Sequence, residues 1–378
     1  MQMHCLNNEM DEAIKLGKSA PYYDDEQGFT NTLLKPYFLL EMSKMFFLDC
    51  DMPSSLSCAD AAINVVESDE KGPVGLFSCA YGLKGISSLY LGKFQDAEDY
   101  LQISTRWCET IEERLDPLFA DTEVKTKQLI ALSNVAYYHW FRYGPVLKSK
   151  GQVRKHGTDI LIDEDEIFNA ASEAKMYLEE ALNEAVGEGH GELERRLEVP
   201  AFCAAYATVL CNYAEIDRYQ GRKVEEEERL LSALKALSIT NDFTHSNSND
   251  QCTYNTSCAP VLGRILHRLG VRALEDENTV VAEGLFKSSI DSLESPSLRW
   301  NPRHQFHRAL VMQDYGSLQT RWEKRERTGE SMINEANRIM DTLPFSVMTE
   351  RSRDYPESIA SITTDSTVKL SHFVQIPE

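Results

Sequence analysis

The sequence predicts an all-α fold, built as a solenoid of antiparallel helix pairs. Apolar residues recur at helical spacing along most of the 378 residues, and alternating strand patterns are scarce. Only 13 Pro and 19 Gly interrupt the chain. Small residues recur twelve positions apart in several segments, as expected where two adjacent helices approach closely. Because one such pair cannot bury both of its faces, successive pairs are expected to stack.

The clearest pair lies at 81–104. Gly85 is a small residue that lets a second helix approach, and Gly92 opens a tight turn. Phe94 begins the second helix, and Ala97 packs back against the small site, twelve residues after Gly85. This segment therefore predicts a helix–turn–helix.

Five further pairs follow the same plan with small residues at corresponding places. In chain order they are 33–66 with Ser43 and Ala62, 127–186, 206–238 with Ala214, Gly221 and Ala233, 261–296 with Gly270 and Ala282, and 305–343 with Gly316, Gly329 and Ala336. Two polar connections, at 187–191 and 240–257, separate neighbouring pairs.

Three features depart from the regular plan. Glu226 stands where a second small residue is expected, which weakens close packing there. The interval between Gly316 and Gly329 is one residue longer than in the other pairs. In the pair at 127–186 an insertion of about 26 residues replaces the turn. Its basic and acidic residues are compatible with a partner-specific loop or with disorder.

These intervals resemble those of the tetratricopeptide-repeat superfamily. SNVA at 133–136, CNYAEIDRYQG at 211–221 and ERLLSAL at 228–234 resemble the kinesin-light-chain style of that repeat. The resemblance implies a right-handed solenoid at 33–344 with an insertion around 145–168. An N-terminal helical segment or cap is expected at 1–32, and a flexible Ser/Thr-rich tail at 345–378, with a short helix or docking strand near 368–374 as a further option.

The resemblance also implies a binding groove lined by the first helix of each pair. Residues two before and one after the small site often point inward in this family. Carried onto this chain, these and neighbouring first-helix positions are Asn134, Tyr137, Trp140, Asn212, Glu215, Arg218, Tyr219, Arg264, His267, Arg268 and Val271. Asn can clamp a peptide backbone with its donor and its acceptor, and Arg can hold a carboxylate through two hydrogen bonds.

Charge and composition exclude several classes of protein. The formal net charge is −21, which repels phosphate and anionic lipid and so argues against nucleic-acid or membrane-surface binding. Lys35, Glu41 and Lys44 interrupt the most apolar region, so no transmembrane span is expected. The N-terminus lacks a basic stretch leading into an apolar one, and the nine Cys are an odd, scattered set. We therefore expect reduced thiols and a cytoplasmic location.

Candidate metal sites lack a complete set of ligands. Cys252 and Cys258 form one loose pair near His245, whereas a zinc knuckle needs two close pairs. His304 and His307 share a helical face, but arginines flank them and no third ligand is evident. No metal or other cofactor is predicted.

Two further segments are better explained by structure than by chemistry. The glycines at 187–191 follow no strand, so they indicate an inter-repeat turn rather than a phosphate loop. The acidic run at 163–166 lacks the Gly of a calcium loop and fits a helix start, where carboxylates complement the dipole. With no nucleophile in a recognisable context, no catalytic residue and no enzymatic activity are predicted.

The leading functional hypothesis is a non-catalytic adaptor or scaffold that binds a peptide or helix of a protein partner in its groove. One alternative is an assembly factor or structural subunit that uses its outer surface or its ends. Another is a helical-repeat enzyme or regulator with His190, His304 or His307 in a pocket. Residues 295–345 carry a formal net charge of +2, and the rest of the chain carries −23. This difference in charge could orient a partner, or it could reflect ordinary ion pairing along helices.

Overall fold

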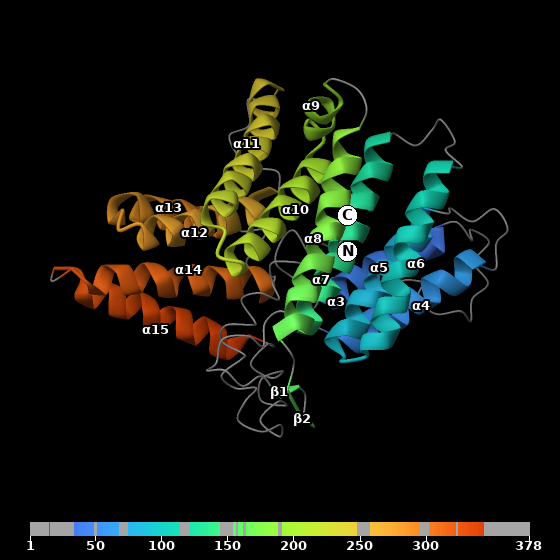
Figure 1. The fold of residues 1–378 in the computed structure, drawn as a ribbon, viewed down its shortest axis with the longest axis horizontal. Helices are drawn as coiled ribbons and strands as arrows, with labels where there is room; N and C mark the ends of the chain where they lie inside the picture. Colours follow the sequence, from blue (N-terminus) through green and yellow to red (C-terminus); the bar gives the residue numbers. More distant parts are fainter. Residues whose placement is uncertain are drawn as a thin grey trace. The chain divides into compact units, whose positions relative to one another are not determined.

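The computed structural model describes most of the repeat region (Figure 1). The described residues are Lys15, 34–48, 51–67, 75–113, 121–143, 154–155, 158–161, 164–187, 191–247, 258–294, 302–322 and 324–343. The predicted N-terminal cap at 1–32, apart from Lys15, and the predicted tail at 345–378 lie outside these residues, as do His190 and Cys252.

Helices account for nearly all of the described structure, which confirms the all-α class. Six long helix pairs match the six predicted ones: α3 (Leu34–Leu48) with α4 (Met52–Glu67), α5 (Gly75–Tyr90) with α6 (Phe94–Glu113), α7 (Asp121–Tyr143) with α8 (Glu164–Val186), α10 (Pro200–Tyr219) with α11 (Lys223–Asn247), α12 (Cys258–Glu275) with α13 (Thr279–Leu293), and α14 (Pro302–Thr320) with α15 (Glu326–Thr342). A short helix, α9 (Glu192–Leu197), lies between α8 and α10. Among the described residues no helix is long and apolar enough to cross a membrane.

The insertion holds the one sheet that the described residues contain. Strand β1 (Arg154–Lys155) pairs antiparallel with β2 (Thr158–Leu161) in a two-stranded hairpin. Helix α8 then begins at Glu164, within the acidic run, as the helix-start interpretation predicts.

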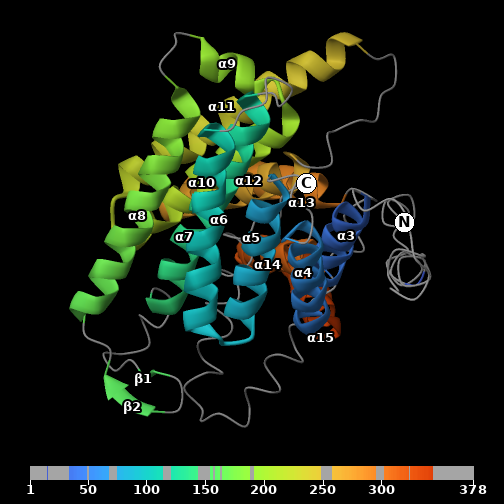
Figure 2. The same cartoon turned by 90° about the vertical axis from the view of Figure 1, so that its right-hand side faces the viewer.

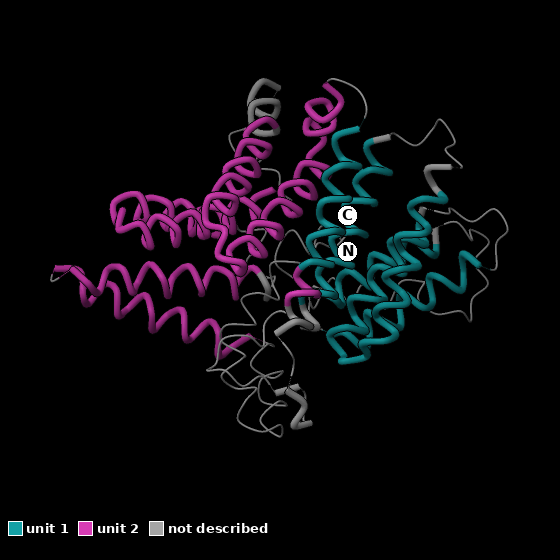
Figure 3. Tube along the Cα trace, in the orientation of Figure 1, with its two compact units in different colours: residues 1–142, 172–189, 374–378 teal, residues 143–171, 190–373 magenta. Residues whose placement is uncertain are grey.

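The helices divide into two compact units (Figure 3). Unit 1 comprises residues 1–142, 172–189 and 374–378, and unit 2 comprises 143–171 and 190–373. In unit 1, α3, α4, α5 and α6 lie side by side in chain order in both views (Figures 1 and 2). In unit 2, the pairs α10–α11, α12–α13 and α14–α15 follow one another in the same way.

Within a pair, the predicted small residues lie where the two helices approach most closely. A Cβ placed on Gly85 of α5 would come within 2.6 Å of Leu101 and 3.2 Å of the Ala97 carbonyl oxygen on α6. On Gly316 of α14 it would come within 2.8 Å of the Gly329 carbonyl oxygen on α15. The thirteen-residue interval in this last pair is therefore still a close helix–helix contact.

The turns of three helix pairs, α5–α6, α10–α11 and α12–α13, share one backbone conformation. Gly92 and Gly221 have positive φ angles of 74° and 75°, which glycine adopts without steric cost. Glu277 stands at the corresponding place between α12 and α13 and has a φ of 61°. An L-residue in this left-handed region is strained by contact between its Cβ and the carbonyl oxygen.

Replacing Glu277 by Gly should therefore stabilise the α12–α13 pair. Relief of the left-handed strain outweighs the extra chain entropy of glycine by about 0.5–1 kcal/mol. The midpoint of urea unfolding should rise for Glu277→Gly and stay unchanged for Glu277→Ala, which keeps a Cβ. An unchanged midpoint for the glycine variant would contradict the argument.

One predicted connection begins later than expected. Residues 240–257 were predicted as polar connection, but α11 continues to Asn247. Residues 240–247 contain no Gly or Pro, so nothing in the backbone interrupts the helical hydrogen bonds there. Polar composition alone therefore placed the end of this helix too early.

Candidate interaction site

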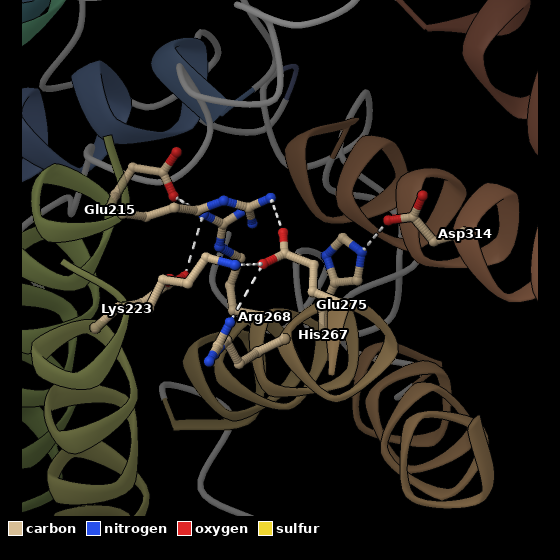
Figure 4. A network of polar contacts seen from close by, with 9 residues as sticks. Glu215, Lys223, His267, Arg268, Glu275 and Asp314 are labelled. Atoms are coloured by element: carbon tan, nitrogen blue, oxygen red, sulfur yellow. Dashed lines mark hydrogen bonds and ion pairs between the residues drawn. The ribbon is translucent and has the colours of Figure 1, made fainter. Parts of the chain in front are cut away.

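In unit 2 the first helices of successive pairs are α10, α12 and α14, and they present polar side chains at equivalent places. Two residues before the small site stand Asn212 on α10, Arg268 on α12 and Asp314 on α14. Polar contacts join residues of α10 to α12 and of α12 to α14 (Figure 4). We call this set of cross-helix contacts the first-helix network.

Arg268 is the centre of the network. Its guanidinium forms an ion pair with Glu215 on α10 and lies 3.9 Å from a carboxylate oxygen of Glu226 on α11. Burial by itself lowers the pKa of Arg268, but the two carboxylates more than offset it, so this pKa lies above its ordinary value. Burial raises the pKa of Glu226, against the opposing effect of Arg268. The three side chains thus form a buried, mutually compensated charge cluster.

Arg264 lies one turn before Arg268 on α12. Its Nη2 donates to Oδ1 of Asn212 at 3.3 Å and lies 3.9 Å from the Cys211 sulfur. Burial lowers the pKa of Arg264, and it raises the pKa of the Cys211 thiol despite the nearby arginines. A neutral thiol is a poor nucleophile, so Cys211 has a packing role.

His267 connects α12 to α14. Its Nε2 lies 2.8 Å from Oδ2 of Asp314, and its ring meets that of His307 edge to face at 5.3 Å. Only 4% of the His267 side chain is exposed, compared with 47% for Asp314. A buried imidazole therefore holds a carboxylate that solvent can reach.

A more open group of ion pairs borders the network. Glu275, at the end of α12, accepts from Arg218 of α10 at 3.0 Å and lies 3.6 Å from the Lys223 ammonium of α11 (Figure 4). Arg272 reaches the same carboxylate at 3.4 Å. Tyr219, the last residue of α10, is half-buried. Such solvent-accessible pairs contribute little stability individually.

The remaining predicted residues lie on α7 in unit 1. Asn134, Tyr137 and Trp140 are all buried. The Tyr137 hydroxyl donates to that of Tyr90 at 3.5 Å, and Oδ1 of Asn134 has no hydrogen-bond partner in the described part of the chain. Val271, the remaining position, is half-buried on α12 and packs against an apolar cluster of α13 and α14.

The structure thus brings together Asn212, Glu215, Arg264, His267 and Arg268, while Arg218 lies at the border of the network and the α7 residues belong to the other unit. Their role in binding a partner stays a prediction.

Two members of the network were missed by the sequence analysis. Asp314 stands two residues before Gly316, so the rule that selected Asn212 and Arg268 would also have found it. Glu226 was noted only as a departure from the small-residue pattern. Its carboxylate lies 3.9 Å from the guanidinium of Arg268. The amino-acid type at one position of a repeat does not reveal such a contact between helices.

A metal centre finds no support in the described residues. They include no group of three or more His, Cys, Asp or Glu side chains arranged to hold a metal ion. His307, considered as a ligand from its spacing to His304, is buried against His267.

Comparisons with known proteins do not assign this chain to a family. No family model matches the sequence, and no curated protein matches it significantly. Among solved structures, BtubC (BKLC) from P. vanneervenii is similar, with a TM-score of 0.45 and 15% identity over 78% of this chain and 91% of that chain. The stacked antiparallel helix pairs described above are consistent with the tetratricopeptide-like class of helical repeats.

Proposed function

We propose that this protein is a non-catalytic adaptor whose first-helix network in unit 2 binds an extended segment of a protein partner. The main supporting observation is that polar side chains occupy equivalent positions on three successive first helices, and that each of them contacts a polar side chain of a neighbouring first helix. Buried ion pairs are seldom the most stable solution for a core, because well-packed apolar residues often do as well or better. Their presence at one register supports recognition rather than stability.

The contacts favour a partner with a basic group. Arg268 is already compensated by two carboxylates, and Asn212 accepts from Arg264. Asp314 is the most exposed member of the register, and His267 engages one of its oxygens. The other oxygen can accept a hydrogen bond from a Lys or Arg side chain of the partner, and such charge-assisted bonds fix orientation.

A cytoplasmic location belongs to the same proposal. None of the six described cysteines, Cys58, Cys79, Cys108, Cys203, Cys211 and Cys258, forms a disulfide. Buried cysteines without disulfides fit a reducing compartment.

The test uses the exposed carboxylate, because truncating the buried residues would also perturb the fold. Proteins that the wild type captures from native extract should be lost with Asp314→Lys and retained with Glu330→Lys. The second variant is the control, because Glu330 is an exposed residue of α15 and its replacement changes the net charge by the same amount. For each captured partner we expect at least about tenfold weaker binding to Asp314→Lys, or 1.4 kcal/mol. Retention of every partner at wild-type affinity by a folded Asp314→Lys chain would refute the proposal.

A second candidate function is a structural subunit or assembly factor that buries its second helices. Exposed apolar residues support it: Val224 and Leu231 lie seven residues apart on one face of α11, and Val280 and Val281 lie in the first turn of α13. Under this alternative, Val224→Ser with Leu231→Ser should release the stoichiometric partners, and Asp314→Lys should not.

A further inference from the structure

Three histidines gather where α12 meets α14 in unit 2. His267 lies on α12, and His304 and His307 lie on α14. The His307 residue is only 2% exposed, and its ring meets the His267 ring at 5.3 Å. His267 also contacts Phe286 of α13, with ring centroids 5.9 Å apart. This histidine cluster therefore lies between the α12–α13 pair and the α14–α15 pair.

Several cationic or ionisable groups of α12 and α14 act on His307. Arg264 and Arg268 on α12 and the other two imidazoles all disfavour a proton on His307. Six carboxylates of the surrounding helices have partners other than His307. Glu215 of α10 and Glu226 of α11 lie beside Arg268, and Asp314 of α14 bonds to His267. Glu283 of α13 pairs with Arg325, Glu294 after the end of α13 pairs with Arg308, and Glu335 of α15 pairs with Arg338.

We propose that the histidine cluster is an acid-sensitive joint, which opens the α14–α15 pair from α12 as pH falls below about 6.5. Opening separates Asp314 from His267 and so dismantles part of the first-helix network. The consequence for partner binding rests on the function proposed above, whereas the opening itself is a property of the chain alone.

The direction follows from proton linkage. Burial lowers the pKa of His307 well below its ordinary value of 6.5, and the neighbouring cationic groups lower it further. Above pH 6.5 the imidazole is neutral whether the joint is closed or open, so pH has no effect. Below pH 6.5 the open joint takes up a proton that the closed joint excludes. The ratio of closed to open molecules therefore falls about tenfold per pH unit, until the folded pKa is reached.

Hydrogen exchange on the free chain tests the joint. After correction for the intrinsic exchange rate, α14 and α15 peptides should open about tenfold more often at pH 5.5 than at pH 7.5. His307→Gln, which cannot take up the proton, should remove this increase. His139→Gln, which changes a histidine of unit 1 paired with Glu173 at 2.7 Å, should leave it intact.

Two results would overturn the proposal. One is unchanged protection of α14 and α15 between pH 7.5 and 5.5 in the wild type. The other is an NMR titration of His307 in the wild-type chain with a midpoint near 6.5, a measurement that stands even if His307→Gln fails to fold. Neither involves the partner, so failure of the joint and failure of the proposed function are distinguishable.

Discussion

Replacing Arg268 by Ala should lower the free energy of unfolding of unit 2 by about 3–5 kcal/mol. The guanidinium is 11% exposed and is the shared counter-charge of Glu215 and Glu226, which are themselves buried. Removing it leaves two carboxylates close together in a poorly solvated place, where neither water nor another cation compensates them fully. The loss should appear as unfolding of α10–α13 at a lower urea concentration, measured through the hydrogen exchange of those helices.

Arg338→Ala is the matched control. Arg338 also pairs with a glutamate, at 2.8 Å, but its side chain is 74% exposed. Its loss should leave the free energy of unfolding nearly unchanged, because surface ion pairs contribute little. Equal effects of the two substitutions would show that the Arg268 cluster is effectively solvated.

A triple change separates stability from recognition. Replacing Arg268, Glu215 and Glu226 together by apolar residues removes the charges and their desolvation cost at once. Stability should then return to within about 1–2 kcal/mol of the wild type. Partner binding should be weakened, because the buried charge cluster that joins α10, α11 and α12 within the first-helix network is gone. A triple variant that binds normally would contradict a recognition role for the cluster.

Gly329→Ala should destabilise the α14–α15 pair by about 1–2 kcal/mol, the net of overpacking and of alanine's better helix propensity. A Cβ on Gly329 would come within 2.5 Å of the Gly316 carbonyl oxygen and 2.8 Å of the Thr320 backbone nitrogen. Both neighbours are backbone atoms, which cannot move aside as a flexible side chain would. The helices must therefore separate, with loss of packing along their whole contact.

Gly284→Ala is the internal control, with the opposite sign expected. Gly284 is an exposed residue of α13, and a Cβ placed on it would have no neighbouring atom within 4 Å. Alanine should therefore stabilise the helix by about 0.5–1 kcal/mol. Thermal unfolding of the two variants should shift in opposite directions. Stabilisation by both would mean that α14 and α15 are less closely packed than described.

Much of the fold was predictable because its signals are local. Gly92 and Gly221 mark turns through their backbone conformation, and Gly85 marks a close helix contact through its size. Each is a property of one residue and its near neighbours. The hairpin at 154–161 and the extension of α11 to Asn247 were not foreseen, because strand pairing and helix ends depend weakly on composition.

The candidate site was predictable only in part. The register rule located Asn212 and Arg268 on their first helices, and its extension to Gly316 would have located Asp314. The rule says nothing about exposure or partners. Arg268 was considered as a clamp for a partner's carboxylate, yet Glu215 and Glu226 already compensate its charge, 53 and 42 residues away in sequence.

The sequence by itself therefore determined the class of fold, the helix pairs and the register of the first-helix residues, because helical periodicity and turn conformation arise from neighbours along the chain. Only the tertiary structure decided that Arg268 is paired and that Asp314 is held by His267 and reaches solvent. It also decided that His307 is buried beside like charges. The physical reason is that the free energy of a charge depends on which helices surround it, and stacking brings together residues that are far apart in the chain.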